Sequence, residues 1–135
     1  MVVTSINPLR IYIYEEGLAR FATCLYNQTD SDGKKSKYMH LTNYSINKKN
    51  VGAFTQNKYE INDGEGSKWS LTALRKLMRN LGMDDKAIWK SIEDIVIKTI
   101  ISAEVQMNSA FEQYVPFSSN CFELLGFDIL IDDML

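Results

Sequence analysis

The sequence predicts an α+β fold in which helices pack on one face of a mainly antiparallel sheet. Two β-rich segments come first, two segments of helical periodicity follow a polar stretch, and a β-rich segment comes last. Apolar residues make up 45% of the chain and charged residues 24%, which is typical of a sequence that folds around a core. Because strands and helices are grouped rather than alternating, the order favours α+β over a parallel α/β sheet.

A β-hairpin is predicted near the amino end. Residues 9–14 and 18–26 are rich in β-branched and aromatic side chains, and Glu15-Glu16-Gly17 between them supplies a turn. Arg20 lies inside the second of these two strands. The polar residues 27–37 that follow predict a loop.

Two helices are predicted in the middle of the chain. The first covers residues 69–81, where Leu and Met recur at spacings of three and four, and Gly82 supplies its carboxyl-terminal stop. The second runs from about residue 85 to about residue 109, with Asp84 as its N-cap. Its expected apolar stripe consists of Ile88, Ile92, Ile95, Val96 and Ile100.

The remaining segments have weaker patterns. Residues 38–45 are short and mixed, and residues 46–66 lack periodicity, which predicts irregular structure. Pro116 and the polar cluster 118–120 end the helical region. Residues 121–131 return to strand character and lead into a turn.

Charge and motif content exclude several classes of protein. The formal net charge of -2 gives no overall attraction to nucleic acid or to an anionic membrane, so we expect neither partner. Cys24 and Cys121 are too few for a disulfide framework or a zinc site, which favours a reducing compartment. Neither GxxxxGK[ST] nor GxGxxG occurs, and no stretch is apolar for long enough to span a bilayer.

Asp128 is the first candidate for chemistry. It lies among apolar residues of a predicted strand, where a buried carboxylate costs several kcal/mol unless it is paired or binds a cation. Magnesium prefers one or two carboxylates together with phosphate oxygens, so an aspartate at a nucleotide cleft would serve. The alternative is an aspartate that points to solvent from an alternating strand.

Two further candidates come from side-chain type. Arg20 offers a fixed fork for a carboxylate or phosphate, and the alternative is a solvent-facing arginine on a half-exposed strand. Residues 40–45 bring an imidazole, two hydroxyls, an amide and a phenol together, which suits a polar ligand or an ordinary turn. His40 is the single histidine and is read as structural.

A stretch of positive charge covers residues 33–59, which contain no Asp or Glu. Its six lysines are Lys34, Lys35, Lys37, Lys48, Lys49 and Lys58. Clustered lysines attract an acidic partner over long range, and the alternative is a solvated loop.

These segments together resemble the tubulin tyrosine ligase-like family. The carriers of the resemblance are HLTNYS at residues 40–45 and GFD at 126–128, with similar sequence at residues 8–22, 98–101 and 121–132. It covers nearly the whole chain and is nearest to the polyglutamylase branch. The family has an ATP-grasp fold and joins an amino acid to a protein carboxylate through an acyl phosphate.

The resemblance implies roles for individual residues. Arg20 would grip the carboxylate of an incoming free glutamate, and Tyr44, Ser45 and Lys68 would also contact that glutamate. No residue of the chain is assigned a catalytic role.

The same resemblance implies ATP and Mg²⁺ as cofactors. Thr42 and Asn43 would line the ATP pocket, and Asp128 would hold Mg²⁺ against the ATP phosphates. The implied partner is tubulin or microtubules through the acidic carboxyl-terminal tails. The implied location is the cytoplasm and cytoskeleton, with the cilium or basal body as a narrower possibility.

Parts of the family pattern are missing from the sequence. A Glu and an Asn that bind magnesium follow GFD in the family, and the nucleotide lysine and phosphate loop precede the segment matched here. We therefore expect residues 1–135 to be the central and carboxyl-terminal part of an ATP-grasp domain, incomplete at both ends and inactive in isolation. A truncated non-catalytic microtubule-binding product or pseudoenzyme, and a glycylase, stay open as alternatives.

Overall fold

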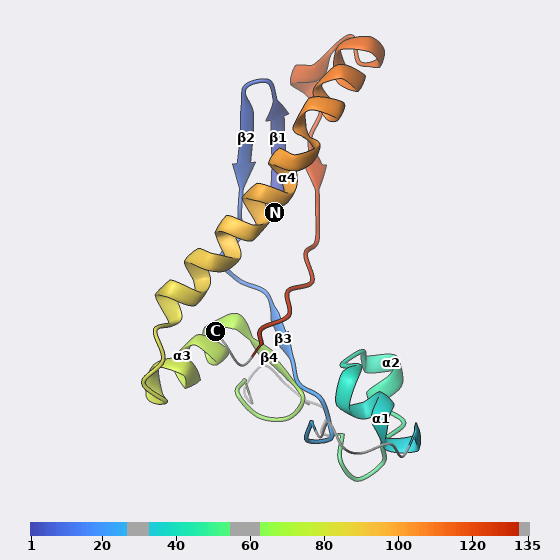
Figure 1. The fold of residues 1–135 in the computed structure, drawn as a ribbon, viewed down its shortest axis with the longest axis vertical. Coiled ribbons are helices and arrows are strands. Elements are labelled where there is room, and N and C mark those ends of the chain that lie inside the picture. The colour runs from blue at the N-terminus through green and yellow to red at the C-terminus, as the bar shows by residue number, and fades with distance from the viewer. Residues whose placement is uncertain (27–32, 55–62, 133–135) are drawn as a thin grey trace. The chain divides into compact units, whose positions relative to one another are not determined.

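The computed structural model describes residues 1–26, 33–54 and 63–132 (Figure 1). Two compact units make up the chain. The first unit consists of Met1–Glu15 and Asp84–Leu135, and the second unit consists of Glu16–Met83. The mixture of helices and antiparallel strands confirms the predicted α+β class.

The first unit contains a three-stranded antiparallel sheet in the order β2-β1-β5. Its strands are β1 (Val2–Ile6), β2 (Leu9–Tyr12) and β5 (Glu123–Leu124). Val2 stands opposite Tyr12 on one side and Leu124 on the other. The tight connection between β1 and β2 contains a cis peptide bond between Asn7 and Pro8.

The predicted hairpin between residues 9–14 and 18–26 is wrong. Strand β2 pairs with β1, whereas β3 (Leu18–Arg20) pairs with β4 (Lys68–Ser70). The physical reason lies at Glu16, whose carboxylate does not close a turn but accepts hydrogen bonds from the backbone of residues 71 and 72. Pairing between strands this far apart in the sequence cannot be predicted from the local pattern of residues.

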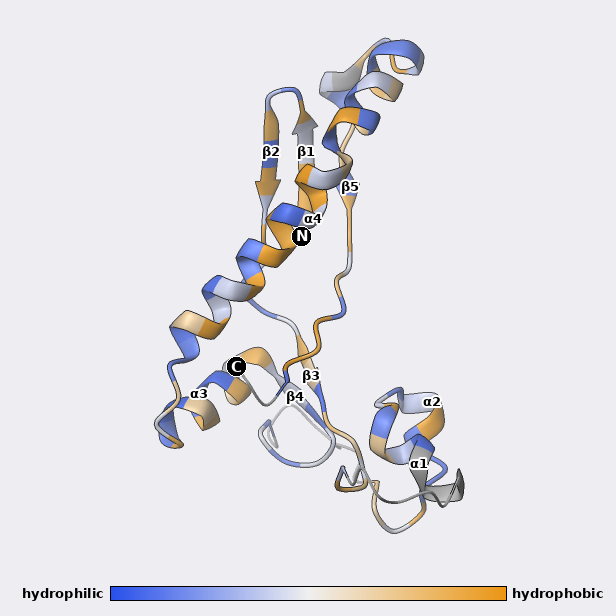
Figure 2. Cartoon of the chain, in the orientation of Figure 1, coloured by the Kyte–Doolittle hydropathy of each residue, from blue (hydrophilic) through white to orange (hydrophobic). Residues whose placement is uncertain are grey.

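Helix α4 (Asp85–Tyr114) is 30 residues long and extends beyond the predicted end near residue 109. The predicted N-cap is confirmed, because the Asp84 carboxylate accepts hydrogen bonds from the amides of Lys86 and Ala87 at 3.1 Å each. In the first unit α4 contacts β1. Figure 2 shows apolar and polar residues mixed along the whole helix.

The core of the first unit lies between α4 and the sheet. Val3, Ile6 and Ile100 are at most 9% exposed and form its centre. Partly buried apolar side chains surround them: Met1, Leu9, Ile11, Met107, Phe111, Leu125 and Phe127. Of the predicted stripe on α4, Val96 and Ile100 are buried, but Ile95 is 52% exposed. Burying each such aliphatic side chain contributes about 1.5–3 kcal/mol.

Helix α3 (Leu71–Asn80) in the second unit begins two residues later than predicted. Lys68–Ser70 form β4 instead, because their backbone pairs with β3. The Ser70 hydroxyl then caps the helix by accepting from the Ala73 amide at 3.0 Å. Gly82 has a φ of +78°, which confirms it as the predicted stop.

Two short helices correct the prediction of loop and irregular structure between residues 27 and 66. Helix α1 (Gly33–His40) occupies part of the predicted loop, and residues 27–32 lie outside the described part of the chain. Helix α2 (Tyr44–Asn47) starts inside the HLTNYS segment. The polar composition of Gly33–His40 shows no helical periodicity, so α1 was not predicted. Its buried apolar residue is Met39, which is 7% exposed.

The predicted strand over residues 121–131 is mostly unpaired. Only Glu123–Leu124 belong to the sheet, and pairing ends where Met1 and Leu125 exchange two hydrogen bonds of 3.0 and 3.1 Å. Residues 126–132 continue outside the strands. The predicted turn at the end falls partly on residues 133–135, outside the described part.

None of the helices formed by the described residues combines the length and the apolar composition needed to cross a lipid bilayer.

Candidate functional site

Arg20 and Lys68 stand directly opposite each other in the second unit. The register of β3 and β4 pairs Leu18 with Ser70, Ala19 with Trp69 and Arg20 with Lys68. Residues directly opposite each other in an antiparallel pair project to the same face. Two residues separated by nearly fifty positions in the sequence therefore present their cationic side chains side by side.

This pair of cations has no internal counter-ion among residues 1–26, 33–54 and 63–132. Arg20 and Lys68 are both exposed, and no described carboxylate forms an ion pair with either. Like charges directly opposite each other destabilise a strand pair. The arrangement therefore favours an anion that can bridge both heads, and a carboxylate has the matching size and charge.

The opposite face of the two strands is held by aromatic packing. The rings of Phe21 and Trp69 lie with centroids 4.9 Å apart, and the indole N–H of Trp69 donates to the Gly66 carbonyl at 2.9 Å. The Phe21 amide also donates to the Ser67 carbonyl at 2.9 Å, which prolongs the pairing beyond Arg20. The cationic face is thus carried by a well-fixed backbone.

The HLTNYS segment forms the corner between α1 and α2. Thr42 is half-buried, whereas Asn43, Tyr44 and Ser45 are exposed. Asn43 stands at the N-cap position of α2, but its side chain makes no cap hydrogen bond. Its amide is therefore available to a ligand.

Asn47 fixes this corner and was not singled out from the sequence. It is 1% exposed, and its Nδ2 donates to the carbonyls of Leu41 and Asn43, the latter at 3.2 Å. Its Oδ1 accepts from the Thr23 hydroxyl at 2.7 Å. The side chain joins the segment after Arg20 to the corner that carries Thr42 and Asn43. The only local signal is the spacing of four residues from Asn43.

Aromatic contacts order the same corner. Tyr44 packs edge-on against Phe54 at 5.7 Å between centroids, and the Lys48 ammonium lies 5.3 Å from the Tyr44 ring centre. His40 makes a T-shaped contact with Tyr26 at 5.5 Å. These contacts orient side chains without using the Tyr44 hydroxyl, which leaves it free for a polar ligand.

The lysine-rich stretch is only partly described. Lys37, near the end of α1, and Lys48 and Lys49, directly after α2, are exposed. Lys34 and Lys35 belong to α1, and Lys58 lies outside the described part of the chain. The exposed members add positive charge near the HLTNYS corner.

Asp128 lies in the first unit, on the segment that follows β5. It is exposed, and no described residue bonds to its carboxylate, which agrees with the alternative of a solvent-facing aspartate. Across the described residues no group of three or more His, Cys, Asp or Glu side chains could hold a metal ion. A single accessible carboxylate still fits one position in the coordination of Mg²⁺, which takes its other ligands from phosphates and water.

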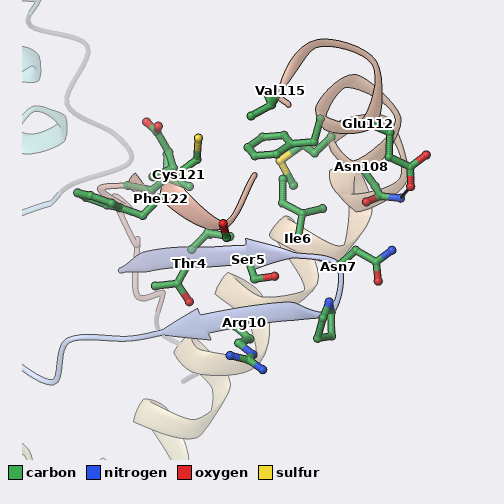
Figure 3. A pocket seen from close by; sticks show the side chains of 17 residues that line it. Thr4, Ser5, Ile6, Asn7, Arg10, Asn108, Glu112, Val115, Cys121 and Phe122 are labelled. Atoms are coloured by element: carbon green, nitrogen blue, oxygen red, sulfur yellow. Dashed lines mark hydrogen bonds between the residues drawn. The ribbon is translucent and has the colours of Figure 1, made fainter. Parts of the chain in front are cut away.

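A cavity of about 920 Å³ opens in the first unit (Figure 3). Apolar side chains such as Ile6 and Val115 line it together with polar residues such as Asn108 and Glu112. Asn108 donates to Glu112 at 3.1 Å. None of the seven predicted site residues lines this cavity, so it is separate from the proposed ligand contacts.

The chain belongs to the tubulin-tyrosine ligase family, whose profile matches residues 1–135. The resemblance predicted from HLTNYS and GFD is thereby confirmed.

Individual relatives are similar over nearly all of the chain. A mouse tubulin polyglutamylase, TTLL5, is 48% identical over 135 residues, which are 100% of this chain and 10% of that protein. A human tubulin monoglutamylase, TTLL4, is 44% identical over 98% of this chain and 11% of its own length. A mouse tubulin polyglutamylase, TTLL6, is 44% identical over 100% of this chain and 16% of its own length. The chain therefore spans about a tenth of the length of the first two relatives.

Proposed function

We propose that this chain is the central part of the catalytic domain of an ATP-dependent protein glutamate ligase that acts on tubulin. Membership of the tubulin-tyrosine ligase family and similarity to proteins named tubulin polyglutamylase and monoglutamylase support the proposal. The domain has the ATP-grasp fold, and activity belongs to a longer protein that carries residues 1–135.

The observation that carries this proposal is the uncompensated pairing of Arg20 with Lys68. A free glutamate has two carboxylates and needs at least two cationic contacts. The Arg20 guanidinium receives one carboxylate through paired N–H bonds, and the Lys68 ammonium neutralises negative charge beside it. Tyr44 and Ser45 add hydroxyl contacts to the same amino acid.

Nucleotide binding is assigned to the corner between α1 and α2. Thr42 and Asn43 contribute a hydroxyl and an amide to the ATP pocket, and Asn47 holds this backbone by donating to the carbonyls of Leu41 and Asn43. Asp128 contributes one carboxylate to Mg²⁺. When bound, Mg²⁺ offsets the negative charge that moves between phosphate oxygens during phosphoryl transfer.

The reaction proceeds in two balanced steps. The terminal phosphoryl group of ATP passes to a side-chain carboxylate of the protein substrate, which yields an acyl phosphate and ADP. The neutral amine of glutamate then attacks the acyl carbon, the bond to phosphate breaks and phosphate leaves, and the amine gives up a proton to water as the amide bond forms. Arg20 and Lys68 hold the glutamate so that its amine faces the activated carboxylate.

The protein partner is an acidic tail of tubulin. Lys37, Lys48 and Lys49 attract it from solution, because clustered positive charge raises the rate at which an acidic segment arrives. This partner places the longer protein in the cytoplasm on the cytoskeleton, including the cilium or basal body.

Glutamate incorporation into tubulin by the longer protein tests the proposal. Substituting Arg20→Ala or Lys68→Ala weakens the binding of free glutamate by about tenfold or more, since each removes a charged hydrogen-bond donor. Lys76→Ala, an exposed lysine on α3, is the matched control and keeps full activity. Incorporation that needs no ATP, or that is unchanged in both site variants, would contradict the assignment.

A non-catalytic microtubule-binding protein is the second candidate. It is favoured by the exposed lysines beside the HLTNYS corner and requires no metal. It predicts sedimentation with microtubules that weakens as salt rises and that is lost when the tubulin tails are removed. Tail-dependent binding without any ATP-driven incorporation of glutamate would favour this candidate over the ligase.

A further inference from the structure

Glu16 joins the start of β3 to the start of α3. Its Oε1 accepts from the amides of Gly17 at 2.9 Å, Leu71 at 2.8 Å and Thr72 at 3.3 Å. Its Oε2 accepts from the Thr72 hydroxyl at 2.5 Å. One carboxylate therefore ties two segments that are more than fifty residues apart in the sequence.

Asp63 performs a similar task on the other side of the junction between β4 and α3. Its Oδ1 accepts from the Ser70 amide at 2.8 Å, and its Oδ2 accepts from the Ser70 hydroxyl. That hydroxyl in turn accepts from the Ala73 amide and caps α3. Asp63 and Glu16 thus fix both the last residue of β4 and the first turn of the helix.

These bonds matter because the strand pair they flank is very short. Strands β3 and β4 pair over three residues each, and an isolated two-stranded ribbon of that size is marginally stable. A slip of one residue would turn every side chain of a strand to the opposite face. Arg20 would then no longer stand beside Lys68.

The two carboxylates do not pair with the two cations. All of their described partners are backbone amides or hydroxyls, and neither forms an ion pair with Arg20 or Lys68. Hydrogen bonds from Thr72 and the Gly17 amide lower the pKa of Glu16, and those from the Ser70 hydroxyl and amide lower the pKa of Asp63. Both acids are ionised at neutral pH but directed at the helix start, which leaves the cations open to a ligand.

We propose that Glu16 and Asp63 are positioning residues for the glutamate site, since they lock the β3–β4 register that places Arg20 beside Lys68. This inference rests on the proposed ligase function. The two carboxylates touch neither the glutamate nor the nucleotide, and they act through the backbone of the strand pair.

The test uses the longer protein with Glu16→Ala and Asp63→Ala, and Glu15→Ala as the matched control. Glu15 is an exposed acid next in sequence, and no described residue is bonded to it. We expect the KM for glutamate to rise about tenfold in both site variants, because Arg20 then lies beside Lys68 in a smaller fraction of the molecules, while the KM for ATP stays within about twofold. Glu16→Gln should recover most of the loss, because its amide oxygen still accepts from the three backbone amides.

Amide hydrogen exchange on the same variants tests the strand register and does not depend on enzymatic activity. The Phe21 amide donates to the Ser67 carbonyl and touches neither carboxylate, so its exchange should accelerate in Glu16→Ala and Asp63→Ala but not in Glu15→Ala if the register is loosened. Equal rises in both KM values, or unchanged exchange, would overturn the inference. If Glu16→Ala fails to fold, the comparison of Thr72→Val with Thr72→Ser decides, since only the second keeps the hydroxyl donor. A wild-type protein that incorporates no glutamate would instead overturn the proposed function.

Discussion

At the scale of single residues, the charges of one cross-strand pair in the second unit oppose its stability. Arg20 and Lys68 repel each other across the strand pair, and the described structure supplies no acid between them. A protein under pressure for stability alone would place opposite charges here. The unfavourable pairing is explained if a negatively charged ligand completes the site.

The substitution Lys68→Glu separates the effect of residue 68 on stability from its effect on ligand binding. It replaces a repulsive cross-strand pair with an attractive one, so the free energy of unfolding of the second unit should rise by about 0.2–1 kcal/mol. The same change should abolish binding of glutamate, which would meet a carboxylate in place of an ammonium. Urea unfolding and titration with free glutamate measure the two effects.

The control for this change is Lys76→Glu on α3, which should alter neither quantity by much. A Lys68→Glu protein that is less stable than the wild type would show that the two side chains do not face each other. Unchanged glutamate binding would show that Lys68 lies outside the site.

At the scale of secondary-structure elements, the sequence predicted the elements whose signals are local. The end of α3 and the start of α4 follow from Gly82 and Asp84, because a helix stop and an N-cap act within one turn. The pairing partners of β2 and β3 could not be predicted, because the Glu16 bonds that redirect the chain reach residues 71 and 72. The role of Glu16 was missed for the same reason, whereas Asp63 was missed because it lies in a segment without periodicity, although its bond to Ser70 spans only seven residues.

In the candidate site, too, local features could be predicted from the sequence and long-range contacts could not. Arg20, Thr42 and Asp128 were identified by type and by resemblance, which depend on sequence alone. The juxtaposition of Arg20 with Lys68 depends on strand register, and the burial of Asn47 depends on a bond to Thr23 in another segment. Neither the strand register nor the burial of Asn47 can be predicted from a local pattern of residues.

Asn47 gives a prediction about how these elements are held together. Asn47→Ala would remove the side-chain donor of the Leu41 carbonyl and the acceptor of the Thr23 hydroxyl, while the Asn43 carbonyl keeps the amides of Ile46 and Asn47. Breaking the hydrogen bonds of this 1% exposed side chain should cost the second unit about 1–3 kcal/mol. Chemical denaturation measures this loss.

The matched control is Asn80→Ala at the end of α3, where the side chain is exposed and the cost should stay within about 0.5 kcal/mol. The KM for ATP should also rise in Asn47→Ala, because Thr42 and Asn43 lie on the loosened corner. An equal loss of stability in both variants would argue against Asn47 as the link between the two segments.

At the scale of the whole molecule, charge is unevenly distributed. The formal net charge is -2, yet residues 33–59 contain six lysines and no acid. Glu16 and Asp63 accept hydrogen bonds from residues at the start of α3. Arg20 and Lys68 on the nearby strand pair are exposed. Such a distribution places positive charge on one stretch of a chain that is negative overall, which is the arrangement that the proposed binding of carboxylates requires.

The same distribution predicts how stability depends on pH. Hydrogen bonding lowers the pKa of Glu16 below its ordinary value of 4.5 and that of Asp63 below 3.8. A lowered pKa in the folded state contributes stability that is fully present above the unfolded-state pKa and is lost as pH falls through the folded-state pKa. The contribution of Glu16 and Asp63 to the free energy of unfolding of the second unit should therefore be constant from neutral pH down to about pH 5. This contribution should decrease as the pH falls further.

Replacing both acids in Glu16→Gln/Asp63→Asn should flatten this dependence, because neither amide titrates. Urea unfolding between about pH 3 and pH 7, followed through Trp69 fluorescence in a Trp89→Phe background, places the probe in the second unit. The stability advantage of the protein with both acids should be constant above pH 5 and should shrink below it. An advantage that persists unchanged to pH 3 would show that the two carboxylates do not gain their hydrogen bonds from the ionised form, and the lock on the β3–β4 register would then need another source.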